Sequence, residues 1–160
     1  MAVFPTAPHA DELVYAPVDG TVLEIRDVDE PLFALELLGR SCAIEPSSPM
    51  IVSPIAGTVT TFADTLHAIG ITSPCGAELL VHMGIGTAAL GGGPFSPRIA
   101  LGDRVEKGEV LTGMDLGMIE AAGIRTTVIT IVANSDEYGC VELLGAGSVR
   151  AGDKLMRLSV

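Results

Sequence analysis

Short β patterns separated by turn residues recur along almost the whole chain, and this regularity constrains the fold more than any other feature. Segments rich in Val, Ile and Thr end at Gly, Pro or Asp, and the 160 residues include 19 Gly and 10 Pro. Such spacing predicts an all-β protein, an antiparallel β-sandwich or flattened barrel with at most short helical turns. The predicted strands are 21–25, 43–45, 50–52, 58–62, 68–72, 79–83, 110–112, 126–133, 141–144 and 155–158.

One short helix is predicted at 115–122. Asp115 is a favourable N-cap residue because its carboxylate accepts hydrogen bonds from the first free backbone N–H groups. Gly123 suits the position just after the helix, where the backbone often turns left-handed. The helix is therefore bounded at both ends by residues that suit the two caps.

Two segments of the chain occur twice. Residues 16–22, Ala-Pro-Val-Asp-Gly-Thr-Val, return as 53–59, Ser-Pro-Ile-Ala-Gly-Thr-Val, and residues 102–111 are echoed by 146–155. Each copy places a tight turn before or between strands. Duplicated hairpins of this kind indicate the barrel-sandwich hybrid architecture, which is shared by lipoyl and biotinyl carriers.

A swinging-arm carrier on that fold needs a modified lysine at a hairpin tip, usually between apolar residues. The chain has two lysines, Lys107 in Glu-Lys-Gly and Lys154 in Asp-Lys-Leu. Neither has the required neighbours. The carrier function is therefore not predicted, although the architecture is.

Length and composition predict one domain at 13–160, preceded by a flexible N-terminal arm at 1–12 that is rich in Pro and Ala. The arm lacks the basic and apolar regions of a secretory signal, and no apolar run reaches membrane-spanning length. We therefore expect a cytoplasmic protein without direct membrane insertion. The three cysteines lack C-x-x-C spacing and are expected to be free thiols.

The net charge of −11 makes nucleic acid and anionic membrane poor partners. A basic protein, in contrast, would be attracted electrostatically. The charge therefore favours a basic protein as the partner over nucleic acid or an anionic membrane.

Two histidines lie in apolar strand patterns, although the chain has only three histidines in all. His82 is flanked by Val81 and Met83, and His67 lies in Thr-Leu-His-Ala-Ile-Gly-Ile. A single histidine on an apolar strand is usually a satisfied core residue, because burying an unpartnered imidazole is costly. Two of them in a chain so poor in histidine indicate a shared site.

The segment around His82 extends this interpretation to a family. Gly-Ala-Glu-Leu-Leu-Val-His-Met-Gly-Ile-Gly-Thr-Ala at 76–88 resembles the phosphorylation signature of glucose-type IIA domains of the bacterial phosphoenolpyruvate-dependent sugar phosphotransferase system. The resemblance covers roughly 13–160, with the matching segments in the same order. These segments are 16–22, 27–46, 52–59, 65–71, 91–95, 102–111, 115–116 and 134–137.

The resemblance implies that His82 accepts a phosphoryl group from the phosphohistidine of the general carrier protein HPr. His82 would then pass it to a cysteine of the sugar-specific IIB domain, which works with the membrane component IIC. It further implies that His67 lies beside His82, that Thr65 supports His67, and that the carbonyl of Gly84 holds Nδ1 of His82. No cofactor and no metal are implied.

The resemblance also implies a docking surface for both protein partners. Four apolar residues match its rim: Leu32, Phe33, Leu37 and Leu38. We expect these side chains to be unusually exposed around His82. Asp136 matches an acidic residue of the rim, whereas Gly86 stands where many relatives carry aspartate.

Two other functions fit the same fold. A zinc peptidase needs an H-x-x-x-D pair and an H-x-H element, but Ile71 stands four residues after His67 and His82 has no histidine two residues away. A non-catalytic binding module with structural histidines is the second alternative. Uptake of phosphate from phosphorylated HPr would distinguish it from the phosphoryl carrier.

Overall fold

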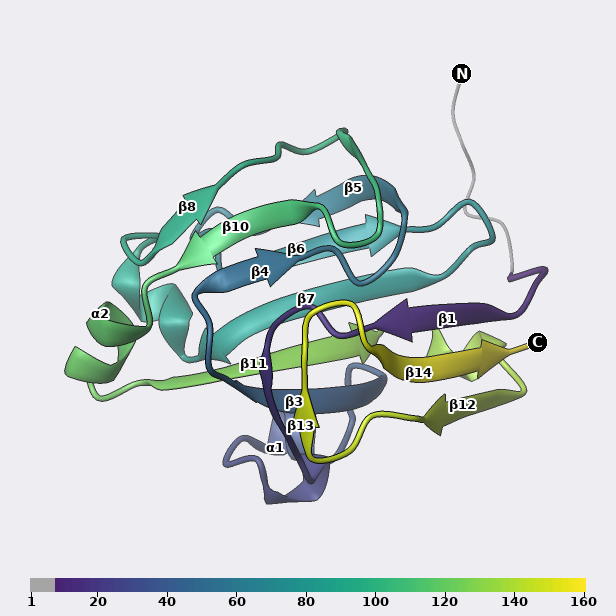
Figure 1. The fold of residues 1–160 in the computed structure, drawn as a ribbon, viewed down its shortest axis with the longest axis horizontal. Coiled ribbons are helices and arrows are strands. Elements are labelled where there is room, and N and C mark those ends of the chain that lie inside the picture. The colour runs from purple at the N-terminus through teal and green to yellow at the C-terminus, as the bar shows by residue number, and fades with distance from the viewer. Residues whose placement is uncertain (1–7) are drawn as a thin grey trace.

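The computed structural model describes residues 8–160, and it is built from three antiparallel sheets (Figure 1). The largest sheet has eight strands in the order β13-β2-β3-β11-β7-β6-β5-β9. Two three-stranded sheets, β4-β10-β8 and β1-β14-β12, lie in front of it in Figure 1. The arrangement is a sandwich, as the strand pattern predicts, and the described sheets do not close into a barrel.

The strands are short and are separated by tight turns. They are β1 (Glu12–Tyr15), β2 (Gly20–Leu23), β3 (Arg40–Pro46), β4 (Met50–Val52), β5 (Gly57–Phe62), β6 (Ala68–Thr72), β7 (Glu78–Ile85), β8 (Phe95–Pro97), β9 (Arg104–Val105), β10 (Val110–Met114), β11 (Arg125–Val132), β12 (Cys140–Leu143), β13 (Ser148–Val149) and β14 (Lys154–Ser159).

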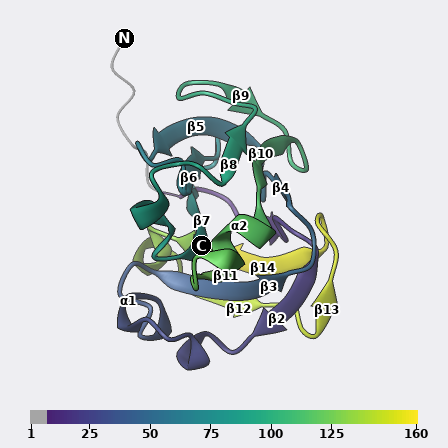
Figure 2. The same ribbon diagram turned by 90° about the vertical axis from the view of Figure 1, so that its left-hand side faces the viewer.

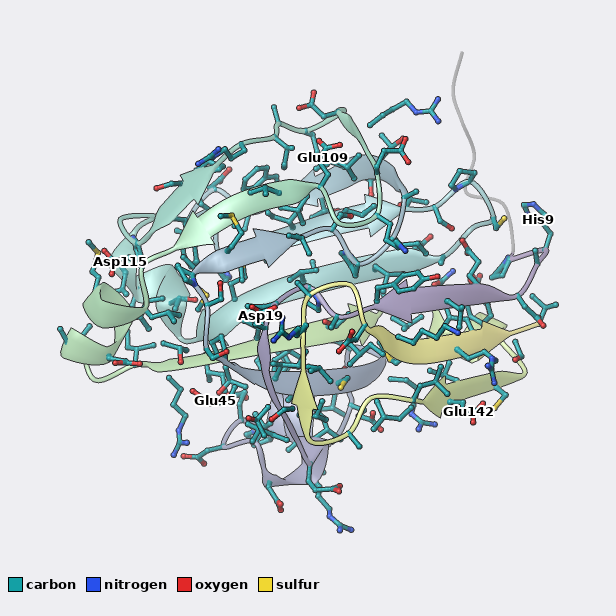
Figure 3. All side chains as sticks on the ribbon, in the orientation of Figure 1. His9, Asp19, Glu45, Glu109, Asp115 and Glu142 are labelled. Atoms are coloured by element: carbon teal, nitrogen blue, oxygen red, sulfur yellow. The ribbon has the colours of Figure 1, made fainter. Side chains whose placement is uncertain are left out.

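The helices are short and lie at the ends of strands. They are η1 (Ile25–Asp27), α1 (Pro31–Ala34), η2 (Thr87–Leu90), α2 (Leu116–Ala121) and η3 (Ser135–Glu137). The predicted helix is α2: the Asp115 side chain accepts from the N–H of Met118, and Gly123 has φ of +74°. Figure 3 labels Asp115 at the start of this helix.

The main core lies between the large sheet and the two small sheets. On β7, Leu79, Val81 and Met83 point into it and are buried. Because side chains alternate along a strand, Leu80 and His82 point to the opposite, outer face of the large sheet. The alternation that predicted the strand therefore also places His82 outside the main core.

Residues 25–38 cover part of that outer face. In Figure 2, α1 lies below β3 at the lower left, whereas β4 and β10 lie above β3. A second, smaller apolar cluster forms beneath this cover. Its buried members are Val28, Phe33, Ala43, Ile129 and Ile131.

The structure adds four strands that the pattern does not predict, namely β1, β8, β9 and β13. Each has only two to four residues, too few to show an alternation, and is defined by pairing with a distant strand. The strand predicted at 21–25 is wrong at its end, because β2 ends at Leu23 and Ile25 belongs to η1. The three cysteines are free, as expected.

Contacts with the rest of the fold are present just before residue 13, where the predicted domain starts. β1 begins at Glu12, Ser73 donates to the Glu12 carboxylate at 2.7 Å, and the N–H of Val160 donates to Asp11 at 2.9 Å. Residues 1–7 of the predicted arm lie outside the described residues. No helix in residues 8–160 has the length and apolarity needed to cross a membrane.

Candidate functional site

His82 lies on β7, in the middle of the large sheet, and is half-buried. Its Nδ1 lies 2.9 Å from the carbonyl oxygen of Gly84. A carbonyl only accepts hydrogen bonds, so Nδ1 carries the proton and donates it. In the neutral ring the lone pair is then on Nε2, the nitrogen that a nucleophilic imidazole needs.

β6 has the predicted bounds, so His67 lies one residue before the strand and not within it, although the sequence around His67 has an apolar strand pattern. The two strands are paired, with Ala68 opposite His82, and the carbonyl of His67 accepts from the N–H of Met83 at 2.8 Å. Thr65 Oγ1 lies 2.6 Å from His67 Nδ1, the contact that the resemblance implies. Leu66, between them, has φ of +63°, a strained value for leucine.

The two imidazole rings share one site. Their centroids are 4.9 Å apart and the planes make an angle of 78°, so an edge of one ring faces the other. The ring of Phe33 contacts His82 from another side, with centroids 4.8 Å apart. The structure thus brings together His67 and His82, which are fifteen residues apart in sequence, as we expected.

The site keeps His82 neutral. Burial, reinforced by the charge of His67, lowers the pKa of His82 to about 4, although the hydrogen bond to Gly84 acts in the opposite direction. Burial also lowers the pKa of His67. An imidazole with so low a pKa is uncharged at neutral pH and has a free lone pair for attack.

The expected apolar rim is only partly exposed. Leu37 is 65% exposed, and Leu32 and Leu38 are also exposed. Phe33, however, is only 4% exposed, so the expectation that it is an exposed docking residue is wrong. Phe33 is buried because it fills the cluster between α1 and the outer face of the sheet, where it also supports the His82 ring.

Leu35, at 68% exposed, is a surface residue of the same segment that the sequence interpretation missed. The rim was identified by resemblance alone. The exposed part of the segment therefore contains four leucines: Leu32, Leu35, Leu37 and Leu38.

Asp136 is exposed and lies in η3, beyond the end of β11. The N–H of Arg40 donates to Ser135 Oγ at 2.9 Å, which places η3 next to the start of β3, close to Leu38. The carbonyl of Glu78 accepts from Ala133 in the same region, and Glu78 is four residues from His82, about 13 Å along an extended strand. Asp136 thus lies at the margin of the site and is not one of its central residues.

A pocket of about 560 Å³ lies beyond Leu80 on the β5–β6–β7 part of the large sheet. Sequence reasoning missed it because its residues come from strands that pair only in the folded chain. Gly70 contributes no side chain, and an added Cβ there would approach Thr61 Cβ to 2.8 Å. The pocket residues are Thr60, Thr61, Gly70, Thr72, Glu78, Leu79, Leu80 and Ala133.

The β-sandwich thus presents one neutral histidine with a free lone pair on Nε2 and a second histidine at the edge of its ring, an arrangement that suits a protein that carries a phosphoryl group. A family model described as "phosphoenolpyruvate-dependent sugar phosphotransferase system, EIIA 1" matches residues 12–138. The chain belongs to this family, as a glucose-type EIIA domain.

Several relatives are similar over most of the chain. The glucose-specific EIIA component of Halalkalibacterium halodurans is 36% identical over 147 residues, which is 92% of this chain and 85% of that protein. The beta-glucoside-specific EIIBCA component of Bacillus subtilis is 39% identical over 148 residues, 92% of this chain but only 24% of that protein. The chain thus spans about a quarter of that multidomain relative.

The fold is similar to a solved structure. The glucose permease IIA from Mycoplasma capricolum matches with a TM-score of 0.82 and 28% identity, covering 93% of this chain and 96% of that one. EIIA components are phosphotransferases, and family membership implies phosphoryl transfer in sugar uptake. This favours the phosphoryl carrier over both the zinc peptidase and the non-catalytic module.

Proposed function

We propose that His82 is the phosphoryl acceptor and that the chain carries the group from phosphorylated HPr to a cysteine of a IIB domain. The observation that carries this proposal is the hydrogen bond between His82 Nδ1 and the Gly84 carbonyl, which leaves Nε2 free to attack. Phosphoryl transfer depends mainly on positioning and charge stabilisation. The Gly84 carbonyl positions the His82 ring, and His67 lies close enough to stabilise charge on a group bound to His82.

In the first transfer, the P–N bond of the donor phosphohistidine breaks as a P–Nε2 bond forms on His82. The donor imidazole leaves with its bonding electron pair. Because His82 is neutral before the attack, no proton has to leave Nε2. The low pKa of His82 supports this step, since a protonated ring has no lone pair to offer.

His67 stabilises the phosphoryl group. Thr65 Oγ1 lies 2.6 Å from His67 Nδ1. In this mechanism the hydroxyl donates to Nδ1, so that the neutral ring keeps its proton on Nε2 and the Nε2–H group donates a hydrogen bond to a phosphoryl oxygen. In the second transfer, the IIB cysteine attacks as the thiolate, so that a P–S bond forms as the P–Nε2 bond breaks and His82 leaves as the neutral imidazole with the bonding electron pair. The Nε2–H group of His67 then stabilises the negative charge on the phosphoryl oxygens as the group leaves His82.

The partners follow from the same proposal. The exposed leucines around α1 and the acidic surface suit partners with an apolar patch and basic residues, and HPr and IIB would use this face in turn. Several relatives carry EIIA fused to IIB and IIC, which supports IIB and IIC as partners. We place this chain in the cytoplasm, beside the IIC component in the membrane.

Labelling with phosphorylated HPr tests the roles of the histidines. His82→Ala should abolish labelling, because the atom that forms the P–N bond is gone. His67→Gln should still accept phosphate but transfer it poorly to IIB, because an amide replaces one hydrogen bond but does not act as a polarising imidazole. His9→Ala, which alters an exposed histidine, is the matched control and should be labelled normally.

The chemical stability of the label identifies the bond. Acid-labile phosphate in the wild type and its absence from folded His82→Ala would support the proposal. Acid-labile phosphate on His67 in His82→Ala at the wild-type rate would reverse the assignment of the two residues.

A further inference from the structure

Gly84, whose carbonyl holds His82, has a backbone conformation that other residues rarely adopt. Its φ is +81°, and a Cβ added there would collide with Cγ2 of Thr87 and lie 3.1 Å from the carbonyl of Arg125. The space beside Gly84 is thus already filled by the Thr87 side chain. Glycine is required both for the dihedral angle and for the close contact.

Thr87 is the first residue of η2 and is 0% exposed. Its hydroxyl donates to the carbonyl oxygen of Met83 at 2.6 Å. This carbonyl belongs to the peptide unit that precedes Gly84. The hydroxyl therefore holds the peptide unit before Gly84, while the methyl group occupies the space where a side chain at residue 84 would lie.

The peptide unit that follows Gly84 is also held. It contains the Gly84 carbonyl, and Ile85 at its other end pairs with Arg125 on β11. With both neighbouring peptide units held, the direction of the Gly84 carbonyl is set, and it points at His82 Nδ1. A residue five positions from His82 in sequence thus determines the acceptor that selects the tautomer of its ring.

We infer that Thr87 is a positioning residue, which keeps His82 in the Nδ1–H tautomer through the carbonyls of Met83 and Gly84. Because the Thr87 side chain is fully buried, we assign it no contact with the phosphoryl group. The inference rests on the proposed role of His82 for its effect on transfer, but not for its effect on the tautomer. Rotation of the Gly84 carbonyl would free Nδ1 and allow the proton to move to Nε2, the attacking atom.

The tautomer is measured directly from the ¹⁵N chemical shifts of His82 at pH 7, without any partner. Wild-type protein should show a protonated Nδ1 and an unprotonated Nε2. Thr87→Val keeps the shape but removes the hydroxyl, and it should raise the Nε2–H population and lower the rate of labelling by HPr about ten-fold. Thr87→Ser keeps the hydroxyl and should restore the wild-type spectrum and rate.

Thr112→Val is the matched control, because Thr112 is also fully buried and donates to a backbone carbonyl, that of Gly113, on β10. It should reduce stability without changing the His82 tautomer. Thr87→Cys provides a second readout if Thr87→Val does not fold. The thiol is a weak donor of similar size and should give an intermediate tautomer population.

A wild-type tautomer in folded Thr87→Val, or in Thr87→Cys where the valine variant does not fold, would overturn the inference. Failure of the proposed function is distinguishable from this result. If His82→Ala were still labelled, the carrier role of His82 would be wrong, whereas the tautomer shifts in the Thr87 series would still test the positioning role.

Discussion

At the residue scale, the site depends on keeping one imidazole neutral and in one tautomer. His82 is held by three different neighbours: a carbonyl at Nδ1, a second imidazole at its edge, and the buried ring of Phe33. The apolar neighbours penalise the charged form, and the carbonyl selects which nitrogen keeps the proton. The carbonyl therefore sets the tautomer, whereas burial and the charge of His67 keep the ring neutral.

An NMR titration of His82 tests the electrostatic part of this description. The midpoint should lie at about 4, below the usual 6.5, because burial and the charge of His67 disfavour the imidazolium. His82 should therefore be neutral at every pH above about 5, and protonation should remove the nucleophile only as the pH falls toward 4. In His67→Gln the midpoint should rise, since the charge of His67 is removed.

A His82 midpoint near 6.5 in the wild type would show that the ring is more solvated than the structure indicates. An unchanged or lower midpoint in His67→Gln would show that the two rings do not interact electrostatically. The folded state is checked at each pH by circular dichroism.

At the element scale, the turn after β7 and the segment around α1 form the surroundings of the site. Gly86 is the N-cap of η2, with φ of +86°, and an added Cβ there would have no atom within 4 Å. The segment around α1 buries Phe33 and exposes leucines on both sides of it. The turn at Gly86 thus has space for a charged side chain, and the segment around α1 supplies apolar contact area.

Gly86→Asp should strengthen the reaction with HPr. Aspartate tolerates a left-handed backbone better than most residues, and the open space accommodates its side chain. A negative charge near the site should raise kcat/KM for a basic partner several-fold, chiefly through faster association. Gly86→Asn has nearly the same shape without the charge, and an equal increase in this control would show that charge is not the cause.

Leu37→Glu should weaken docking without unfolding the chain. The side chain is 65% exposed, and loss of one interface anchor costs at least about 1 kcal/mol, or about five-fold or more in kcat/KM for HPr. Leu101→Glu is the matched control, because Leu101 is 64% exposed and receives the same charge. Equal kcat/KM values for the two variants would remove Leu37 from the docking surface.

Phe33→Glu should unfold or strongly destabilise the protein, in contrast to Leu37→Glu. A carboxylate in the cluster under α1 would be buried without a partner, and the packing of a phenyl ring would be lost. The free energy of unfolding in urea should fall by about 3 kcal/mol or more. A variant as stable as the wild type would show that α1 lifts from the sheet at little cost.

At the scale of the whole molecule, the net charge is −11, and the acidic residues are not confined to the site. Figure 3 labels Asp19, Glu45, Glu109, Asp115 and Glu142 on well-separated parts of the molecule. A distributed negative field attracts a basic partner at long range, whereas the leucines act only after contact. The acidic surface should therefore affect the rate of association with the partner more than the contacts in the bound complex.

Salt should therefore slow the reaction at limiting HPr. Raising NaCl from about 50 mM to about 300 mM shortens the screening length and should lower kcat/KM several-fold, with little change in kcat at saturating HPr. The unfolding midpoint, followed in the same buffers, separates this effect from a loss of folded protein. A kcat/KM value independent of salt would show that long-range charge has no part in the encounter.

The sequence by itself determined the local features of this protein. Alternation along 79–83 and 68–72 predicts strands, because side chains on a strand point to opposite faces in turn. Asp115 and Gly123 predict α2, because caps act within a single helical turn. Resemblance to a family adds the contact of His82 with the Gly84 carbonyl and the roles expected of His67 and Thr65.

Only the tertiary structure decided which residues meet and which are buried. Phe33 looks like its leucine neighbours in sequence, yet it is buried because α1 folds onto β3 and β11. The short strands β9 and β13 exist only through pairing with β5 and β2. The pocket beyond Leu80 depends likewise on strands that pair only in the folded chain. Burial and pairing are set by non-local packing, whose free energy no single segment contains.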